Sequence, residues 1–206
     1  TVINRVTCKP RLGWDEYSII IDEVAMRLQD VGVQALTIHG RTRKQMYKGK
    51  ADWSLIAKVK ENPHIKIPIF GNGDIDSSQK ALYFKNKYGI DGIMIGRAAI
   101  GYPWIFNEIK HFIATGNELE PPSISERVEV AKRHLKLSLE WKGERLGIFE
   151  MRRHYTNYFK RIPDFKSYRT RLVETADPKL LFSILDEIVI LIRGFKLRLP
   201  IDTQFV

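Results

Sequence analysis

The stretch Ala35-Leu36-Thr37-Ile38-His39-Gly40-Arg41-Thr42 joins a short apolar run to a polar ending. Similar runs recur through the first 115 residues, and longer segments with helix-like apolar spacing lie between them. Near-continuous apolar strands that alternate with helices are typical of a parallel sheet covered by helices. The predicted strands are Arg5–Lys9, Ala35–His39, Ile67–Gly71 and Gly92–Gly96, and the predicted helices are Tyr17–Val31, Trp53–Glu61 and Ser77–Tyr88.

The number of these units indicates part of a barrel. A complete (β/α)8 barrel takes about 250 residues, so four strand–helix units amount to roughly half of one. The chain also begins with Thr1 and enters a predicted strand almost at once. We therefore predict an α/β fold in which residues 1–116 form the second half of a TIM barrel. A complete half-barrel that pairs with a second copy is the alternative.

A change of character follows the polar stretch Gly116–Glu120. Pro121 and Pro122 mark the boundary, and every periodic segment beyond them is helical. We therefore predict an all-α domain over residues 121–206. Its predicted helices are Arg127–Lys142, Gly147–Lys160, Ser167–Glu174 and Pro178–Phe195.

The charge of the chain favours a polyanionic partner. The net charge is +10, and residues 142–171 hold nine basic side chains against three acidic ones. Aromatic side chains alternate with these basic residues, a pattern found in nucleic-acid-binding proteins. Solvated charges on an amphipathic helix are the alternative. From charge and position, the candidate RNA-binding residues are Arg152, Arg153, Lys160 and Arg161.

Composition also argues against several classes of protein. The single cysteine, Cys8, rules out an internal disulfide, and the five histidines lack the spacing of a metal site. No apolar run approaches the roughly 20 residues of a membrane span, and no basic-then-apolar leader opens the sequence. A cytoplasmic protein without a metal or a membrane segment is the simplest interpretation.

Each predicted strand ends in glycines or polar residues, which in β/α barrels is where the active site forms. Gly71-Asn72-Gly73-Asp74 and Gly96-Arg97 follow the last two strands, where such barrels often bind phosphate through backbone N–H groups. Arg97 would add charge-assisted contacts. The earlier strands end in Lys9-Pro10-Arg11-Leu12-Gly13-Trp14 and His39-Gly40-Arg41-Thr42.

Strand alternation assigns directions to these side chains. If Lys9 points into the barrel, Thr7 does so too, and Cys8 faces the surrounding helices as a small buried hydrophobe. By the same rule, His39 shares a face with Thr37, whereas Leu36 and Ile38 pack outward. An end-of-strand lysine that reaches solvent and a hydrogen-bonded structural histidine are the alternatives for Lys9 and His39.

The ordered set of motifs resembles the second half of the tRNA-dihydrouridine synthases, most closely the bacterial B-type branch. The resemblance covers nearly the whole chain. It rests on the strand endings above together with three further segments. These are Gly101-Tyr102-Pro103-Trp104-Ile105-Phe106, Phe149-Glu150-Met151-Arg152-Arg153-His154 and Tyr158-Phe159-Lys160.

The resemblance implies an FMN-binding barrel followed by a helical domain that grips tRNA. In the family, NADPH reduces FMN, the flavin passes hydride to C6 of a uridine, and a cysteine protonates C5. The uridine is flipped out of the RNA to reach the flavin. Lys9 would lie near the isoalloxazine ring, and the last two loops would hold the phosphate. The implied FMN-binding residues are Lys9, His39, Asn72, Gly73, Asp74, Gly96 and Arg97.

One departure from the family concerns catalysis. The family's catalytic cysteine lies in the first barrel half, and Cys8 cannot replace it because it lies on the wrong face of the Lys9 strand. No catalytic residue is therefore assigned here, and the chain alone is expected to be inactive. The expected partner is tRNA, and no protein partner is expected to be required, with pairing to a missing N-terminal half or to a second copy as the alternative. The alternatives are a non-catalytic RNA-binding module and another FMN- or phosphate-binding barrel enzyme.

Overall fold

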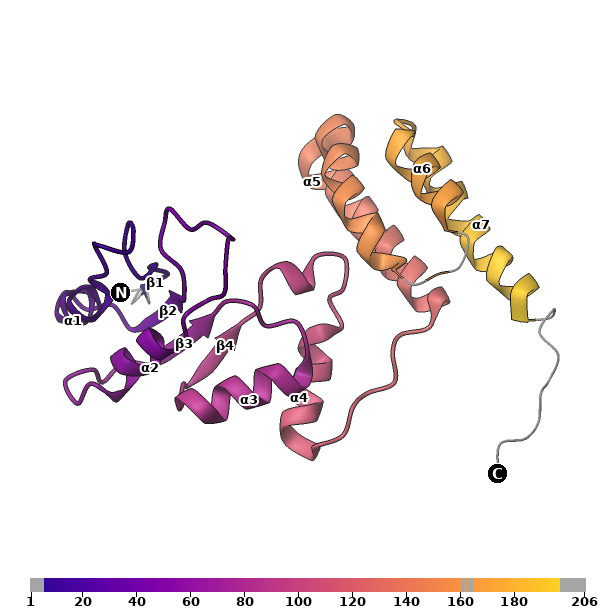
Figure 1. Cartoon of the computed structure of the whole chain (residues 1–206). Helices are drawn as coiled ribbons and strands as arrows, with labels where there is room; N and C mark the ends of the chain where they lie inside the picture. The colour runs from indigo at the N-terminus through magenta and orange to yellow at the C-terminus, as the bar shows by residue number, and fades with distance from the viewer. Residues whose placement is uncertain (1–5, 161, 163–164, 197–206) are drawn as a thin grey trace, which may run out of the picture. The chain divides into compact units, whose positions relative to one another are not determined.

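The structure is a computed structural model that describes residues 6–160, 162 and 165–196, with side chains through residue 190. Its contacts divide the chain into two compact units (Figure 1). Unit 1 comprises Thr1–Ala99 and Trp104–Leu119, and unit 2 comprises Ile100–Pro103 and Glu120–Val206. The short segment 100–103 therefore groups with the C-terminal residues, although it precedes the expected boundary.

Unit 1 contains a four-stranded sheet in which all neighbouring strands are parallel, as predicted. The strands follow the order β1-β2-β3-β4, the same as along the chain. They are β1 (Thr7–Cys8), β2 (Ala35–His39), β3 (Ile69–Asn72) and β4 (Gly92–Met94). The third strand begins two residues later than predicted, after Pro68, and includes Asn72. Parallel neighbours in chain order need a crossover after every strand, and helices provide these crossovers.

The helices of unit 1 pack against one face of the sheet. They are α1 (Ile21–Asp30), α2 (Ser54–Glu61), α3 (Ser78–Tyr88) and α4 (Ile105–Thr115), with the 3-10 helix η1 (Arg97–Ala99) before α4. Leu36, Ile38 and Ile69 are fully buried, which confirms the predicted outward direction of Leu36 and Ile38. The indole of Trp53, at the start of α2, would lie 2.1 Å from a Cβ placed on Gly71 of β3. Only a glycine leaves room for that ring.

The first helix begins four residues later than the prediction of Tyr17. The intervening residues form a compact loop in which Gly13 pairs with Ile19 and the Ser18 hydroxyl donates to Asp15 at 2.8 Å. These local side-chain bonds compete with helix formation. Helix α4 was not among the sequence predictions.

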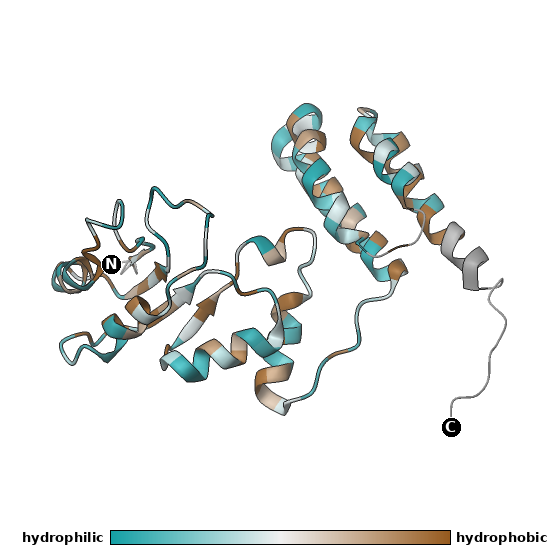
Figure 2. Cartoon of the chain, viewed as in Figure 1, coloured by the Kyte–Doolittle hydropathy of each residue, from teal (hydrophilic) through white to brown (hydrophobic). Residues whose placement is uncertain are grey.

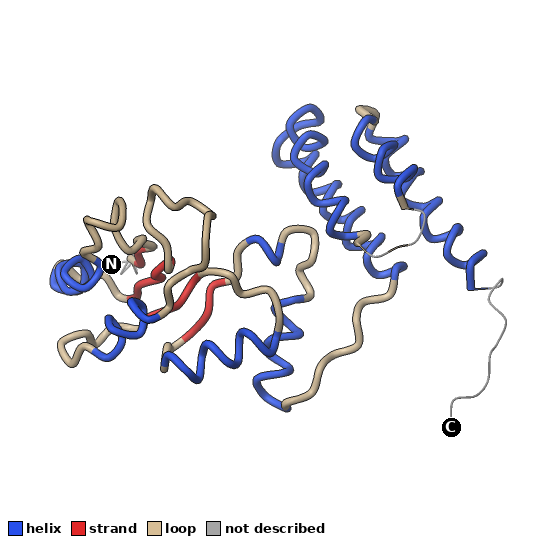
Figure 3. The backbone as a smooth tube through the Cα atoms, viewed as in Figure 1, coloured by secondary structure: helices blue, strands red, loops and turns tan. Residues whose placement is uncertain are grey.

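Unit 2 contains only helices among its described residues, whereas unit 1 contains strands as well (Figure 3). They are α5 (Ile124–Tyr158), α6 (Lys166–Glu174) and α7 (Pro178–Lys196). Helix α5 is broken at Gly143, whose φ of 74° and ψ of 169° are not helical. The two predicted helices on either side of this break are therefore its two arms.

The arms of α5 form an antiparallel hairpin. A Cβ on Gly147 would lie 2.8 Å from the backbone oxygen of Ser138, so the backbones approach closely. Further along, His134 Nδ1 lies 3.1 Å from the Tyr158 hydroxyl. Polar and apolar residues lie side by side on the helices of both units, as in amphipathic helices (Figure 2). Within the described residues, no helix is both long and apolar enough to span a membrane.

Candidate functional site

The loops that follow β1 and β2 are joined at the carboxyl ends of the strands. The Arg11 side chain donates to the carbonyl oxygens of Thr42 and Met46, at 2.8 and 3.1 Å. Four backbone hydrogen bonds also connect the loops. They run from His39 to Pro10, from Leu12 to Arg41, from Arg43 to Gly13 and from Lys44 to Trp14. The two strand endings therefore form one platform rather than two independent loops.

An ion pair between Arg41 and Asp74 lies at the centre of the site. Arg41, only 2% exposed, donates from Nη2 to both carboxylate oxygens of Asp74, at 2.8 and 2.7 Å. The same nitrogen lies 2.6 Å from the carbonyl oxygen of Gly49. Asp74 also accepts from the backbone N–H of Ala51, at 2.8 Å, and from Arg97, at 3.1 Å. One carboxylate thus connects the loops after β2, β3 and β4.

The surroundings of Asp74 keep it ionised. Burial raises the pKa of its carboxyl. The hydrogen bonds from Ala51 and Arg41 and the charges of the nearby arginines lower this pKa by more, so it lies below its usual value. Its φ of 56° is left-handed, a conformation that Asp tolerates better than most residues. Since both oxygens are already occupied, Asp74 is suited to hold the arginines in place rather than to contact an anion.

Gly73 occupies a position that excludes other residues. Its φ is 138°, and an added Cβ would lie 2.5 Å from the Cβ of Ala51. Its carbonyl oxygen accepts from Trp53 Nε1 at 3.0 Å. The Trp53 ring is buried and packs against Phe84, with ring centroids 4.7 Å apart. A core aromatic residue therefore holds the loop after β3 in place.

His39 and Asn72 are register partners at the ends of β2 and β3, on the face opposite the helices. Both are buried, and Asn72 donates from Nδ2 to the Met94 carbonyl oxygen at 2.8 Å. Burial, with the charges of Arg11, Lys9 and Arg41, lowers the pKa of His39 to about 4, although Asp74 opposes this shift. His39 is therefore a neutral imidazole at pH 7, able to donate and to accept one hydrogen bond.

Two cations and an open glycine lie at the edges of the site. Lys9 is exposed, and desolvation and the charge of Arg11 lower its pKa. The side chain of Arg97 is 55% exposed, and its guanidinium lies 4.8 Å from the ring centroid of Tyr47. A Cβ on Gly96 would meet no described atom within 4 Å, so a ligand can approach the backbone there.

Comparison with known proteins decides the family. The family model described as "Dihydrouridine synthase (Dus)" matches residues 1–190. This chain belongs to the dihydrouridine synthase family. It is 44% identical over 169 residues to "Probable tRNA-dihydrouridine synthase 1" of Synechocystis sp., with 82% of this chain and 47% of that protein covered.

Two further relatives support the same family. The chain is 40% identical over 173 residues to "Probable tRNA-dihydrouridine synthase" of Rickettsia conorii, covering 84% of this chain and 52% of the relative. It is 42% identical over 149 residues to "tRNA-dihydrouridine synthase B" of Shewanella oneidensis, covering 72% and 46%. The chain thus spans about half the length of the curated relatives it matches.

The dihydrouridine synthase motifs contain residues whose importance shows only in three dimensions. Arg41, Arg11 and Trp53 were not among the predicted site residues, although two of them lie within the quoted strand endings. An arginine directly after one strand and an aspartate after the next is the sequence signal for the Arg41–Asp74 pair. Nothing comparable in the sequence indicates that Trp53 holds the Gly73 carbonyl group.

The helices that follow the two phosphate loops leave few backbone N–H groups free for an anion. Gly96 is followed by the three-residue helix η1, not by an α-helix. Helix α3 begins at Ser78, and the Ser77 side chain already accepts from the Lys80 N–H of its first turn. Arg97 and the open backbone at Gly96 are therefore the main features of these loops available to an anion.

Two of the predicted RNA-binding residues of unit 2, Arg152 and Arg153, differ in burial and direction. Arg152 is half-buried, with its guanidinium 5.8 Å from the Phe149 ring centroid. Arg153 is exposed and donates from Nε to His154 at 3.3 Å. Successive helical residues point about 100° apart, which separates these two arginines. Lys160 is exposed, and Arg161 lies outside the described residues.

The titration of His39 gives a prediction for unit 1. The folded pKa of about 4 lies below the ordinary value of 6.5, so the unfolded chain binds the proton more tightly. The contribution of His39 to stability is therefore fully present above pH 6.5 and is lost as the pH falls from 6.5 toward 4. NMR titration of the His39 ring should give a midpoint near 4, and Arg11→Gln should raise it. A midpoint near 6.5 in the wild-type chain would contradict this assignment.

Proposed function

We propose that the full-length protein reduces uridine in tRNA to 5,6-dihydrouridine with FMN and NADPH. In this proposal, unit 1 is the FMN-binding second half of a (β/α)8 barrel, and unit 2 binds the tRNA. The printed names of the relatives and the family match support the reaction. The parallel sheet in chain order supports the barrel. The observation that carries the proposal is the cluster of cations around neutral His39 and the Arg41–Asp74 pair.

The residues present fit an anionic cofactor such as FMN. Arg41 Nη1 is buried and has no hydrogen-bond partner among the described residues, so an unsatisfied cationic donor remains in the site. Arg97 and Lys9 are exposed cations, and Asp74, which pairs with Arg97, is also held by Arg41. A phosphate would therefore meet a positive site whose carboxylate charge is already compensated.

Each site residue has a role that follows from its surroundings. Arg97 and the Gly96 backbone would hold the phosphate, and Asp74 and Gly73 would position Arg97. Lys9, His39 and Asn72 lie toward the face opposite the helices and would hold the ring system through hydrogen bonds. When bound, the flavin supplies hydride-transfer chemistry between NADPH and C6 of the uridine.

Among the described residues, the thiol of Cys8 is not placed to supply the proton for C5. Cys8 is the register partner of Leu36, which is fully buried on the helix-facing side of the sheet. A thiol on that side does not reach a ligand on the opposite face. We therefore expect the chain alone to bind FMN without forming dihydrouridine.

FMN binding by this chain tests the roles in unit 1. Titration followed by flavin fluorescence should show that Arg97→Ala weakens FMN binding by about tenfold or more, because charged hydrogen bonds are among the strongest. The same variant should bind riboflavin, which lacks the phosphate, as the wild type does. Arg43→Ala, an exposed arginine on the neighbouring loop, and Cys8→Ala are the matched controls. Equal losses for FMN and riboflavin would overturn the assigned role of Arg97.

The reaction itself is tested with the full-length protein. Unmodified tRNA, FMN and NADPH are incubated with it, and nucleosides are analysed by mass spectrometry for the gain of two hydrogens. Dihydrouridine formation is expected. Binding of tRNA with neither flavin binding nor dihydrouridine would favour the non-catalytic RNA-binding module instead.

A further inference from the structure

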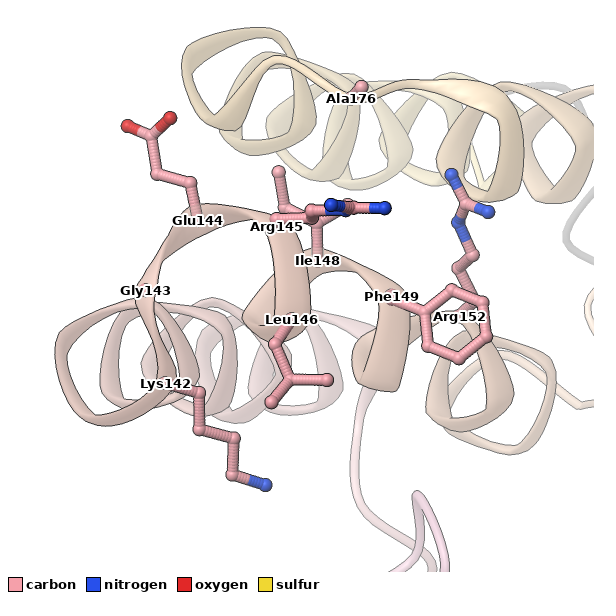
Figure 4. Close-up of a pocket in the computed structure, with 9 residues that line it drawn as sticks. All are labelled: Lys142, Gly143, Glu144, Arg145, Leu146, Ile148, Phe149, Arg152 and Ala176. Carbon is pink, nitrogen blue, oxygen red and sulfur yellow. The ribbon is translucent and has the colours of Figure 1, made fainter.

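A cavity of about 870 Å³ lies in unit 2 at the turn of the α5 hairpin (Figure 4). We call residues 142–152 the α5 elbow; they include the reversal at Gly143. The elbow lines the cavity on one side, and Ala176, between α6 and α7, lines it on the other. A volume of this size is within the range of small-molecule sites. The cavity belongs to unit 2 alone and is separate from the site in unit 1.

The charge around this cavity is unbalanced. Lys142 is paired with Glu150 of the second arm. Arg145 and Arg152 also line the cavity, and within the described residues neither has a carboxylate oxygen within 4 Å. Two guanidinium groups at one cavity repel each other, and an anion between them relieves this repulsion. Arg152 Nε is moreover buried without a hydrogen-bond partner among the described residues.

Glu144 does not offset these arginines. It is exposed and lines the cavity. Figure 4 shows its carboxylate on the side away from Arg152, whereas the Arg145 side chain extends toward the side where Arg152 and Phe149 lie. The cavity therefore presents cationic groups beside an aromatic ring.

Phe149 provides the second feature of the site. Its side chain is 64% exposed although it lies beside the cavity, and Arg152 lies over its ring. An exposed aromatic ring beside arginines is the combination with which proteins bind single-stranded nucleic acid: the ring stacks with a base, and the cations meet the phosphates. A purely anionic ligand would not require the ring.

We propose that the α5 elbow binds one unstacked nucleotide of an RNA strand, with its base against Phe149 and its phosphate at Arg145 and Arg152. This inference rests on the proposed function, because it assigns a contact surface for the same RNA. It also changes the predicted set of RNA-binding residues. Arg152 remains, Arg145 and Phe149 are added, and Arg153 faces elsewhere.

Binding of a fluorescently labelled, unmodified tRNA transcript to the full chain tests the aromatic contact. Phe149→Ala should weaken binding by about tenfold, within the range found when a base-stacking aromatic is truncated. Phe149→Tyr should bind as the wild type does. Trp141→Ala is the matched control, because Trp141 is an 84% exposed aromatic on the same hairpin that does not line the cavity. Equal losses for Trp141→Ala and Phe149→Ala would overturn the assignment of the base to Phe149.

The phosphate contact has its own readout. The slope of log Kd against log salt should fall by about one in Arg145→Gln and in Arg152→Gln, as expected for the loss of one phosphate contact. Arg133→Gln, an exposed arginine on the first arm, should leave the slope unchanged. Circular dichroism should show that each variant keeps the helix content of the wild type.

A second probe, hexauridylate, separates failure of the elbow from failure of the proposed function. If the wild type binds tRNA and the Phe149, Arg145 and Arg152 variants bind it equally well, the elbow inference is overturned and the function stands. If the wild type binds hexauridylate in a Phe149-dependent manner but does not bind tRNA, the nucleotide site at the α5 elbow is supported and tRNA is ruled out as the substrate. Absence of binding to both probes overturns the elbow, while FMN binding still tests unit 1.

Discussion

Replacing Asp74 with alanine is expected to destabilise unit 1 by about 3 kcal/mol, because a buried charge that loses its partner costs this much or more. Arg41 is almost fully buried, and its closest charged contacts are to the two oxygens of Asp74. Alanine also lacks the tolerance of aspartate for the left-handed backbone at this position. Hydrogen exchange of the β2 and β3 amides measures the effect within unit 1. FMN binding should be lost together with the position of Arg97.

Three variants isolate the cause of this loss. Asp74→Asn keeps the left-handed backbone and one acceptor oxygen, so it should retain part of the stability. Arg41→Met combined with Asp74→Ala should recover part of the loss, because no buried charge then remains unpaired. Asp76→Ala removes a nearby exposed carboxylate that pairs with Lys80, and its effect should stay below about 0.5 kcal/mol. A similar effect for Asp76→Ala and Asp74→Ala would contradict the central role of the buried pair.

Replacing Gly73 with alanine is expected to destabilise unit 1 by about 3 kcal/mol, since backbone strain and overpacking each cost about 1–3 kcal/mol. The φ of Gly73 is 138°, and the new Cβ would lie 2.5 Å from that of Ala51. Relief of this clash would displace the carbonyl group that Trp53 holds. The loop would then no longer align Asp74 with Arg97, and FMN binding should fall with stability.

Gly89→Ala is the matched control for Gly73→Ala. Gly89 ends α3 with a φ of 58°, and a Cβ there would meet no described atom within 4 Å. This variant should cost only about 1 kcal/mol, the price of the left-handed conformation alone. Hydrogen exchange of β3 distinguishes the two variants. Equal destabilisation would mean that contact with Ala51 is not what makes Gly73 necessary.

The predictions for unit 1 depend on the same excess of positive charge. Unit 1 places Lys9, Arg11, Arg41 and Arg97 around a site with one central carboxylate. Burial and the excess positive charge together lower the pKa of His39, and the same charge favours an anionic ligand. The cations that suit a phosphate therefore help to keep the neighbouring imidazole neutral, and both effects should weaken when Arg11 or Arg41 is neutralised.

The alternation of strands and helices and the directions of the strand side chains were predictable because they depend on local periodicity. Leu36 and Ile38 face the helices, as alternation along a strand requires, and Gly143 breaks α5 between the two predicted helices. Predictions failed where local hydrogen bonds intervened. The Asp15–Ser18 turn delays the first helix. Helix α4 was not predicted, although Ile105, Ile109 and Phe112 recur at helical spacing.

By itself, the sequence determined the parallel α/β sheet, the positions of the polar strand endings and the family, because these depend on residue type and spacing along the chain. Only the tertiary structure decided which of those endings meet. Arg41 and Asp74 are 33 residues apart in the chain and 2.7 Å apart in space. The depressed pKa of His39 and the place of Arg145, Arg152 and Phe149 at one cavity have the same origin. Charge and burial act through space, and the fold sets the distances over which they act.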